Sequence, residues 1–188
     1  MGRGDEASRA ADRSEPPADR LRRGDVAAFH ALVEEHGAYL YRVALALTGR
    51  VEDAEDVVQA ALLAACRSIR SFRGAASLKT WLTRILLRQA GRHRKKLARR
   101  RSVPLDAARP VESNGEAEPA SDVRMDVTAA LHALPAAFRE VVVLREFSGL
   151  RYEQIAELLG LPRGTVESRL FRARRRLREL LRGYIDHE

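Results

Sequence analysis

The sequence has little that could crosslink the chain, bind a metal through thiolates or anchor it in a membrane. Cys66 is its only cysteine, which excludes an intramolecular disulfide and a cysteine-rich metal site. No apolar run approaches the roughly 20 residues that a membrane-spanning helix needs, and the N-terminus has no apolar signal core. We therefore expect a cytoplasmic protein in which Cys66 is a small buried residue.

Aromatic residues are also scarce. They make up 5% of the chain, whereas apolar residues as a whole make up 45%. The core must therefore consist mostly of Leu, Val, Ile and Ala, a composition that favours helices over strands. No stretch alternates between polar and apolar residues over a useful length, so the sequence predicts an all-α fold.

Patterns that would indicate catalysis or cofactor binding are missing. The histidines are His30, His36, His93, His132 and His187, and none has the spacing of a metal ligand set. There is no glycine-rich phosphate loop, and no acidic cluster faces a candidate nucleophile. We expect no catalytic residue, no metal, no cofactor and no small-molecule substrate, and we do not expect an enzyme.

Acidic residues are outnumbered by basic ones. The 34 Lys and Arg against 26 Asp and Glu give a formal net charge of +8. Such an excess predicts an anionic partner, either a nucleic acid or an acidic membrane surface.

Two changes in composition divide the chain. Residues 1–24 are polar and show no periodic apolar face, which predicts a disordered N-terminal arm. Residues 102–125 are rich in proline and acidic residues, which predicts a flexible linker. The rest of the chain is expected to form two small helical domains, residues 25–101 and 126–184.

In the first of these domains, helical spacing of apolar residues predicts four helices. The first begins after Asp25 and ends near Gly37, the second ends at Gly49, and the third runs from about Glu52 to Ser71. The loop Phe72–Ser77 follows, and Ser77 can serve as the N-cap of the fourth helix. That helix ends in a basic stretch, with eight Arg or Lys and no acid between Arg88 and Arg101.

The second domain is predicted to contain a helix-turn-helix. Helices over 127–133 and from Pro135 to Ser148 precede the stretch YEQIAELLGLPRGTVESRLFRARRRL. In this stretch Gly160 supplies the left-handed residue that ends a short helix, and Pro162 sets the start of the next. The second helix of such a motif lies in the DNA major groove.

The outward face of that second helix is a candidate DNA-binding surface. Between Arg163 and Arg182 there are eight arginines and two acids, whereas a merely solvated helix face usually mixes both signs. The residues assigned to this face are Arg163, Thr165, Glu167, Ser168, Phe171, Arg172 and Arg175. Residues near the helix start are expected to reach base edges, and the later arginines to hold phosphates.

Two stretches together resemble bacterial RNA polymerase sigma factors of the extracytoplasmic-function (ECF) subfamily. They are GRVEDAEDVVQAALLAACRSIRSFRGAASLKTWLTRIL in the first domain and LPAAFREVVVLREFSGLRYEQIAELLGLPRGTVESRLFRARRRL in the second. The resemblance implies a sigma region 2 domain at 25–101 and a sigma region 4 domain at 126–184. It also implies the function: binding core RNA polymerase, reading −10 and −35 promoter elements and aiding promoter melting.

The resemblance assigns roles to three sets of residues. Those implied to bind the clamp helices of the largest polymerase subunit are Asp53, Glu55, Asp56 and Gln59. Those implied to bind the −10 element and nearby phosphates are Phe72, Arg73, Arg84, Arg88, Arg92, Lys95, Lys96 and Arg99. The helix-turn-helix face would read the −35 element. The acidic residues implied to bind the polymerase have an alternative role, because acids in the first turn of a helix stabilise its positive end. Trp81 is interpreted as a core residue rather than a base-stacking wedge.

The resemblance further implies partners and location. A sigma factor of this subfamily would also contact the flap of the second-largest polymerase subunit, would have an anti-sigma factor as partner, and would be a monomer when free. It would lie with the nucleoid in holoenzyme, or at the inner membrane face when a membrane-bound anti-sigma factor holds it.

The sequence departs from the family pattern at several positions. After Gln59 the family usually has an acid, an Arg and an aromatic residue, and here these positions are Ala60, Ala64 and Cys66. In the helix implied to bind the −10 element, the usual Arg-Asn pair is replaced by Leu87-Arg88, and a usual Asp is replaced by Arg92. The −10 preference is therefore not fixed by the resemblance. Arg151 stands where a Ser or Thr N-cap is usual, a loss of about 1 kcal/mol.

Three other functions are weighed against this one. A stand-alone DNA-binding regulator would dimerise on palindromic half-sites, but no dimerisation helix is evident and the stretch DAEDVVQ would have no role. A basic membrane-surface helix would not need the turn residues around Gly160. An enzyme acting on nucleic acid lacks candidate catalytic groups.

Overall fold

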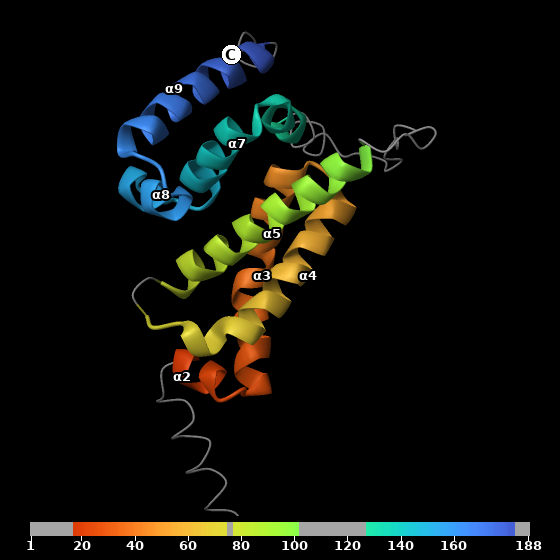
Figure 1. Ribbon diagram of the computed structural model, residues 1–188, viewed down its shortest axis with the longest axis vertical. Helices are drawn as coiled ribbons and strands as arrows, with labels where there is room; N and C mark the ends of the chain where they lie inside the picture. Colours follow the sequence, from red (N-terminus) through yellow and green to blue (C-terminus); the bar gives the residue numbers. More distant parts are fainter. Residues whose placement is uncertain (1–16, 75–76, 102–126, 183–188) are drawn as a thin grey trace, which may run out of the picture.

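The computed structural model describes residues 17–74, 77–101 and 127–182, and every regular element within these ranges is helical (Figure 1). In chain order the elements are α2 (Pro17–Arg22), α3 (Val26–Thr48), α4 (Val51–Ser68), the 3-10 turn η1 (Ile69–Ser71), α5 (Leu78–Arg101), a helix over residues 127–133, α7 (Ala136–Val142), the π-helical turn η2 (Val143–Phe147), α8 (Tyr152–Leu159) and α9 (Arg163–Leu180). The all-α prediction is confirmed. The predicted linker, residues 102–125, lies outside the described residues.

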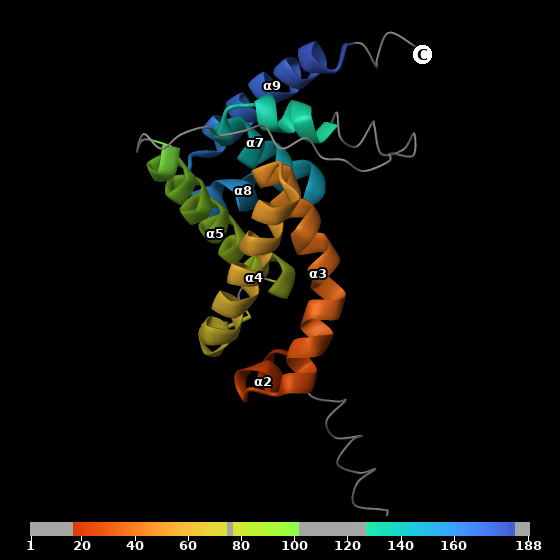
Figure 2. The ribbon, with the colours of Figure 1, turned by 90° about the vertical axis from the view of Figure 1, so that its right-hand side faces the viewer.

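The first domain, residues 17–101, is built on α3, α4 and α5, which pack against one another (Figures 1 and 2). Its core is aliphatic, as the scarcity of aromatics predicts, and includes Leu40, Val43, Val57, Leu82 and Leu86, each at most 2% exposed. Two of these helices begin where the capping residues predict. Asp25 Oδ1 accepts hydrogen bonds from two backbone N–H groups of the first turn of α3, and Ser77 Oγ accepts one from Thr80.

The predicted break at Gly37 is wrong, because α3 is one continuous helix that ends only at Gly49. A glycine inside a helix costs about 1 kcal/mol relative to alanine. The residues that α3 buries on either side of Gly37 outweigh that cost. Gly49 has φ 77°, the left-handed conformation that ends a helix.

The N-terminal arm is shorter than predicted, because residues 17–22 form α2 and pack on the first domain. Leu21 is 4% exposed, Arg20 pairs with Asp25, and the Arg22 guanidinium donates to the Phe72 carbonyl. A six-residue helix with one buried leucine is too short to show apolar periodicity. Residues 1–16 lie outside the described part of the chain.

Cys66 is exposed, which corrects the prediction of a buried thiol. The buried side of α4 consists of Ala54, Val57, Ala61 and Ala65. Cys66 is one residue further along, and a step of one residue turns a helix by about 100°. The thiol therefore points away from the core.

The second domain, residues 127–182, contains the predicted helix-turn-helix. α8 ends at Gly160, which has φ 65°, and the Leu161 N–H bonds the Ala156 carbonyl across the turn. α9 then buries Val166, Leu170 and Ala173. The helix before this motif begins one residue after Pro135, which occupies the N-cap position rather than the first helical one, and it closes with the π-helical turn η2.

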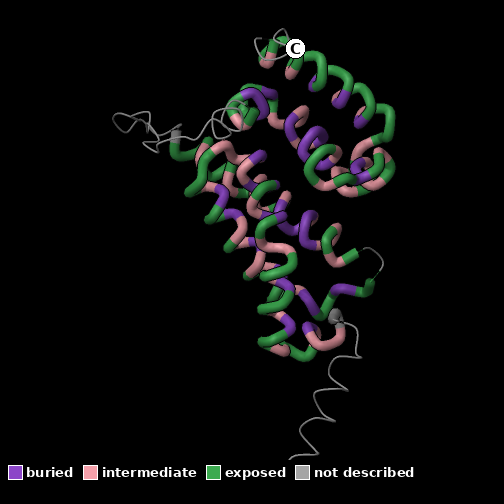
Figure 3. Tube along the Cα trace, turned by 180° about the vertical axis from the view of Figure 1, so that it is seen from behind, coloured by how far each residue is buried: buried purple, intermediate pink, exposed green. Residues whose placement is uncertain are grey.

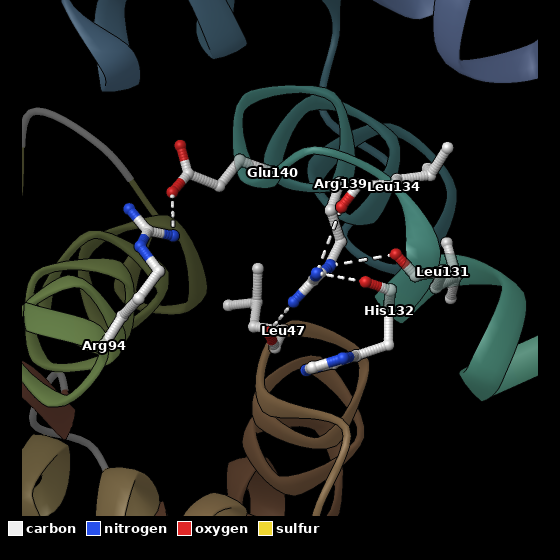
Figure 4. A network of polar contacts seen from close by, with 7 residues as sticks. All are labelled: Leu47, Arg94, Leu131, His132, Leu134, Arg139 and Glu140. Atoms are coloured by element: carbon white, nitrogen blue, oxygen red, sulfur yellow. Dashed lines mark hydrogen bonds and ion pairs between the residues drawn. The ribbon is translucent and has the colours of Figure 1, made fainter. Parts of the chain in front are cut away.

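One buried arginine joins the two domains (Figure 4). Arg139, on α7, is 9% exposed and donates to four carbonyl oxygens. Three belong to the second domain, those of Leu131 (2.9 Å), His132 (2.6 Å) and Leu134 (3.1 Å), and the fourth is that of Leu47 (2.7 Å) at the end of α3. Burial lowers the pKa of the Arg139 guanidinium. The residue thus connects three helices through backbone acceptors.

Replacing Arg139 with Met should lower the free energy of unfolding by about 3 kcal/mol, because buried acceptors lose a charged donor. Arg139→Lys should not restore this stability, because one ammonium group cannot reach carbonyls that lie on several sides of a planar guanidinium. Urea denaturation followed by far-UV circular dichroism measures both variants. A change under about 1 kcal/mol for Arg139→Met would show that water replaces the guanidinium.

Candidate nucleic-acid interface

The outer face of α9 is open to solvent along the helix (Figure 3). Of the seven residues predicted to bind DNA there, all are exposed except Thr165, which is half-buried. Phe171 is 67% exposed. Arg172 and Arg175 make no ion pair with any residue that the structure describes. The predicted surface is therefore exposed, with an apolar ring beside available cations.

Arg163, at the start of α9, is held by carboxylates. Its Nη1 lies 2.7 Å from Glu153 Oε1 on α8, and its Nε donates to Glu167 Oε1 at 2.8 Å. The hydrogen bond to Glu167, reinforced by the charge of Glu153, raises the pKa of Arg163. Arg163 must leave these partners before it can bind guanine bidentately. Glu167 is thus placed to orient Arg163 as well as to face DNA.

The basic stretch of α5 forms a stripe along one side of the helix. Arg84, Arg88, Arg92, Lys95 and Arg99 recur at spacings of three and four residues, which places them on the same face. Arg84 is half-buried and the others are exposed, as is Lys96 beside them. This arrangement is suited to following a line of phosphates.

Two cations of α5 contact the second domain. Arg84 Nη2 lies 3.3 Å from Glu157 Oε1 on α8, and Arg94 Nη1 lies 2.9 Å from Glu140 Oε1 on α7 (Figure 4). Arg94 had no predicted role. It lies to one side of the stripe, so neither periodicity nor composition singled it out.

The loop after η1 does not offer the Phe72 ring to a base in this conformation. Phe72 is 7% exposed, and its ring centroid lies 5.3 Å from that of Trp81. Trp81 itself is half-buried and packs against the core, as interpreted from the sequence. Arg73, the next residue, is exposed. Of the two, only Arg73 is available to DNA without rearrangement.

The acidic set on α4 divides into two parts. Glu55, Asp56 and Gln59 are exposed on one face, where Leu63 is also 53% exposed. Asp53 instead turns toward α5, where its Oδ1 lies 2.8 Å from His93 Nε2. Asp53 therefore belongs to the contact between α4 and α5 rather than to the exposed face.

An open cleft of about 580 Å³ lies between the domains. Leu47, Leu87 and Leu97 contribute to its apolar lining, and Arg94, Arg139 and Glu140 are among its polar residues. Within the described ranges no three metal-ligating side chains gather into a candidate metal site. The same ranges contain no helix long and apolar enough to cross a membrane.

Comparison with known proteins identifies the family. Residues 32–100 match the family model for sigma-70 region 2, and residues 124–177 match that for sigma-70, region 4. The chain belongs to the sigma-70 family. The chain is 37% identical over 170 residues to the ECF RNA polymerase sigma-E factor of Escherichia coli K12, covering 83% of this chain and 87% of that protein. It is 34% identical over 170 residues to the RNA polymerase sigma-H factor of Pseudomonas aeruginosa, with 83% and 87% covered.

Solved structures give the same assignment. The sigma factor RpoE of Bartonella quintana, solved with the anti-sigma factor NepR, aligns with a TM-score of 0.67 and 30% identity over 84% of this chain and 98% of that one. CnrH, solved with the cytosolic domain of CnrY, aligns with a TM-score of 0.67 and 28% identity over 89% and 96%. The ECF resemblance and the two-domain fold are confirmed. The chain is a sigma factor that directs promoter-specific initiation by RNA polymerase.

Arg139, like Arg94, is a residue of this region that sequence reasoning missed. One signal for it was present. It is the only basic residue in the stretch LPAAFREVVVL, one helical turn before the buried Val142 and Val143. A cation placed on an apolar face needs acceptors, so the pattern could have indicated a buried hydrogen-bonding arginine.

Replacing Arg172 with Ala should weaken binding to a cognate −35 duplex by roughly 1–3 kcal/mol, the range for a residue that reads a base edge. Arg163→Ala should cost less, because Glu153 and Glu167 compete with DNA for that guanidinium. Fluorescence anisotropy of holoenzyme on matched and scrambled −35 duplexes measures both. Equal losses on the two duplexes for Arg172→Ala would make it a phosphate contact instead.

Replacing Arg151 with Ser should raise the free energy of unfolding by about 1 kcal/mol. The Arg151 side chain has no acceptor for the free N–H groups at the start of α8, although its backbone N–H donates to Gln154 Oε1 at 2.9 Å. Arg151→Ala, which also lacks an acceptor, is the matched control. Thermal unfolding of both variants tests this, and equal melting temperatures would exclude a capping effect.

Proposed function

We propose that the chain binds core RNA polymerase through the exposed face of α4, the −10 element through α5 and the −35 element through the outer face of α9. The observation that supports this proposal best is that acidic and basic side chains lie on different helices. The exposed acids Glu55 and Asp56 lie on α4, whereas the basic stripe and the arginines of the reading face lie on α5 and α9. The chain thus has one surface for a basic partner and two for DNA.

The α4 face suits a protein partner better than a nucleic acid. Its carboxylates would repel phosphates. Leu63 adds exposed apolar area beside Gln59 and Asp56, and a small apolar patch rimmed by polar groups is typical of protein interfaces. We infer that Glu55, Asp56, Gln59 and Leu63 contact the clamp helices of the largest polymerase subunit.

The α5 stripe is long enough to hold one strand through the melted region. From Arg84 to Arg99 the helix rises about 22 Å, which corresponds to about six base pairs of duplex. Cations along a strand, together with sites for unstacked bases, favour opening. We assign Arg73 and the stripe to the −10 region. Phe72 is assigned a role only after the loop rearranges.

The α9 face is assigned to the −35 element. Arg172 and Phe171 lie together on the exposed side, where Arg can pair with guanine and a ring can pack on a thymine methyl. Arg175 lies a turn beyond Phe171 and is placed to hold phosphates. We further propose a contact of this domain with the flap of the second-largest subunit.

An anti-sigma factor is the proposed regulatory partner. One similar solved protein was captured with an anti-sigma factor, and another with the cytosolic domain of CnrY. The cleft between the domains, with leucines on its walls and charges at its edge, offers apolar surface for a protein segment.

We also propose that the chain is located in the cytoplasm and that it is a monomer when free.

Co-elution with bacterial core RNA polymerase tests the polymerase surface. The native chain should co-elute, and Asp56→Arg should not, because reversing one interface charge places like charges together. Glu35→Arg is the matched control, since it makes the same charge change at an exposed position of α3. Asp53→Asn should still co-elute, because Asp53 faces His93.

Loss of co-elution in both Asp56→Arg and Glu35→Arg would indicate a bulk charge effect. Failure of the native chain to co-elute would overturn the proposed function.

A further inference from the structure

The short helix α2 is anchored to the segment that follows η1. It packs against both α3 and η1 (Figure 1), and its Leu21 side chain is 4% exposed. The Arg22 guanidinium donates with Nε to the Phe72 carbonyl at 3.0 Å, and with Nη2 to the same oxygen. Because two donors of one planar, charged group bind this oxygen, they fix the direction of the peptide group between Phe72 and Arg73.

The Arg22 guanidinium is itself held within α2. Its Nη1 donates to Asp19 Oδ1, three residues earlier on the helix. The Arg22 side chain is 35% exposed, so its pairing with Asp19 contributes little to overall stability. What the carboxylate and the carbonyl together determine is the orientation of the guanidinium, and with it the direction of the peptide group that Arg22 binds.

The backbone around this peptide group determines where two side chains point. Phe72 is extended, with φ −72° and ψ 111°, and neighbouring side chains of an extended chain point to opposite sides. The Phe72 ring accordingly packs 5.3 Å from that of Trp81, whereas Arg73 is exposed. Gly74 follows with φ 73°, a left-handed conformation that other residues adopt only at a cost. Arg73 thus lies between an anchored carbonyl and a glycine turn.

We propose that Arg22 is a positioning residue for the −10 contact. Through the Phe72 carbonyl it keeps the Phe72 ring in the core and directs Arg73 toward nucleic acid. This role rests on the proposed function of Arg73 at the −10 element. It adds a residue of α2, outside the basic stripe of α5, to those that determine −10 binding. A rearrangement that exposes the Phe72 ring has to break the Arg22 contact first.

A direct contact of Arg22 with a phosphate is the alternative. Its Nε, Nη1 and Nη2 atoms each have an acceptor within the chain already, so a phosphate would have to replace one of them. An indirect role through Arg73 is therefore favoured. The two roles differ in a measurable way, because a direct contact would add to that of Arg73 and an indirect one would not.

Trp81 reports on the position of Phe72, because it is the only tryptophan of the chain. Arg22→Met removes the donors and keeps an aliphatic stem, and Arg42→Met makes the same change at an exposed position of α3. In Arg22→Met the Trp81 emission maximum should move to longer wavelength and acrylamide quenching should rise roughly twofold, because the ring pair opens to water. Arg42→Met should leave both unchanged.

Far-UV circular dichroism checks that each variant stays helical. Arg22→Lys keeps the charge but cannot place two donors on one carbonyl as a planar guanidinium does. Its Trp81 emission should therefore lie between that of the native chain and that of Arg22→Met. If Arg22→Met loses its helical signal, Arg22→Lys decides the question, and an unchanged Trp81 emission in that variant overturns the proposal.

A double-mutant cycle tests the effect on Arg73. Holoenzyme with each variant is titrated with a 15-nucleotide single-stranded DNA of mixed sequence by fluorescence anisotropy, with core polymerase alone as the background. Arg73→Ala should weaken binding roughly fivefold and lower the salt slope by about 0.7, the value for one phosphate of a single strand. Arg22→Met should lose as much, and adding Arg73→Ala to it should have no further effect. Combined with Arg42→Met, Arg73→Ala should have its full effect.

Unchanged Trp81 emission in a folded Arg22→Met chain would overturn the proposal, since Phe72 would then be held without Arg22. Additive losses in the cycle would also overturn it and would make Arg22 a direct contact. Failure of the native chain to co-elute with core polymerase rejects the proposed function, and the Trp81 measurement on the free chain still decides whether Arg22 holds Phe72. Normal co-elution with additive losses rejects only the positioning role.

Discussion

The arrangement of the two domains depends on how one buried guanidinium is satisfied. The last carbonyls of a helix have no partner within it and carry partial negative charge. The end of α3 and the end of the helix over 127–133 both direct such carbonyls at Arg139. A planar group with five donors can satisfy acceptors from several directions, which an ammonium cannot. The junction is therefore held without a buried carboxylate. Separating the two domains would for this reason leave no anion in an apolar site.

Local rules predicted most helix ends, and they failed where packing was stronger. Gly49 and Gly160 end helices because each adopts a left-handed conformation that other residues adopt only at a cost. Gly37 does not end one, because its backbone stays helical within a well-buried α3. α2 was missed for the opposite reason, since its one buried leucine makes no pattern and its anchor, the Phe72 carbonyl, is 50 residues away.

The candidate surfaces were predictable where helical spacing alone determines on which side of its helix a side chain lies. The α9 face followed from periodicity alone and is exposed as predicted. Asp53 did not follow, because its partner His93 lies 40 residues further along the chain. Phe72 was assigned to DNA through family resemblance, yet its ring completes the core beside Trp81. Contacts between distant segments, such as Arg84 with Glu157, leave no trace in local composition, and those contacts determine which cations are available.

Carboxylates hold arginines on α5 and α9, the two helices that we assign to DNA. Glu167 and Glu153 hold Arg163 on α9, as Glu157 and Glu140 hold Arg84 and Arg94 on α5. Exchanging a carboxylate for a phosphate replaces one anion by another, so the net Coulomb gain per cation is small. DNA binding also releases counterions from the duplex, and that gain does not depend on sequence. Releasing the arginines costs the same free energy on any sequence, so discrimination must come from the base contacts that a cognate site adds.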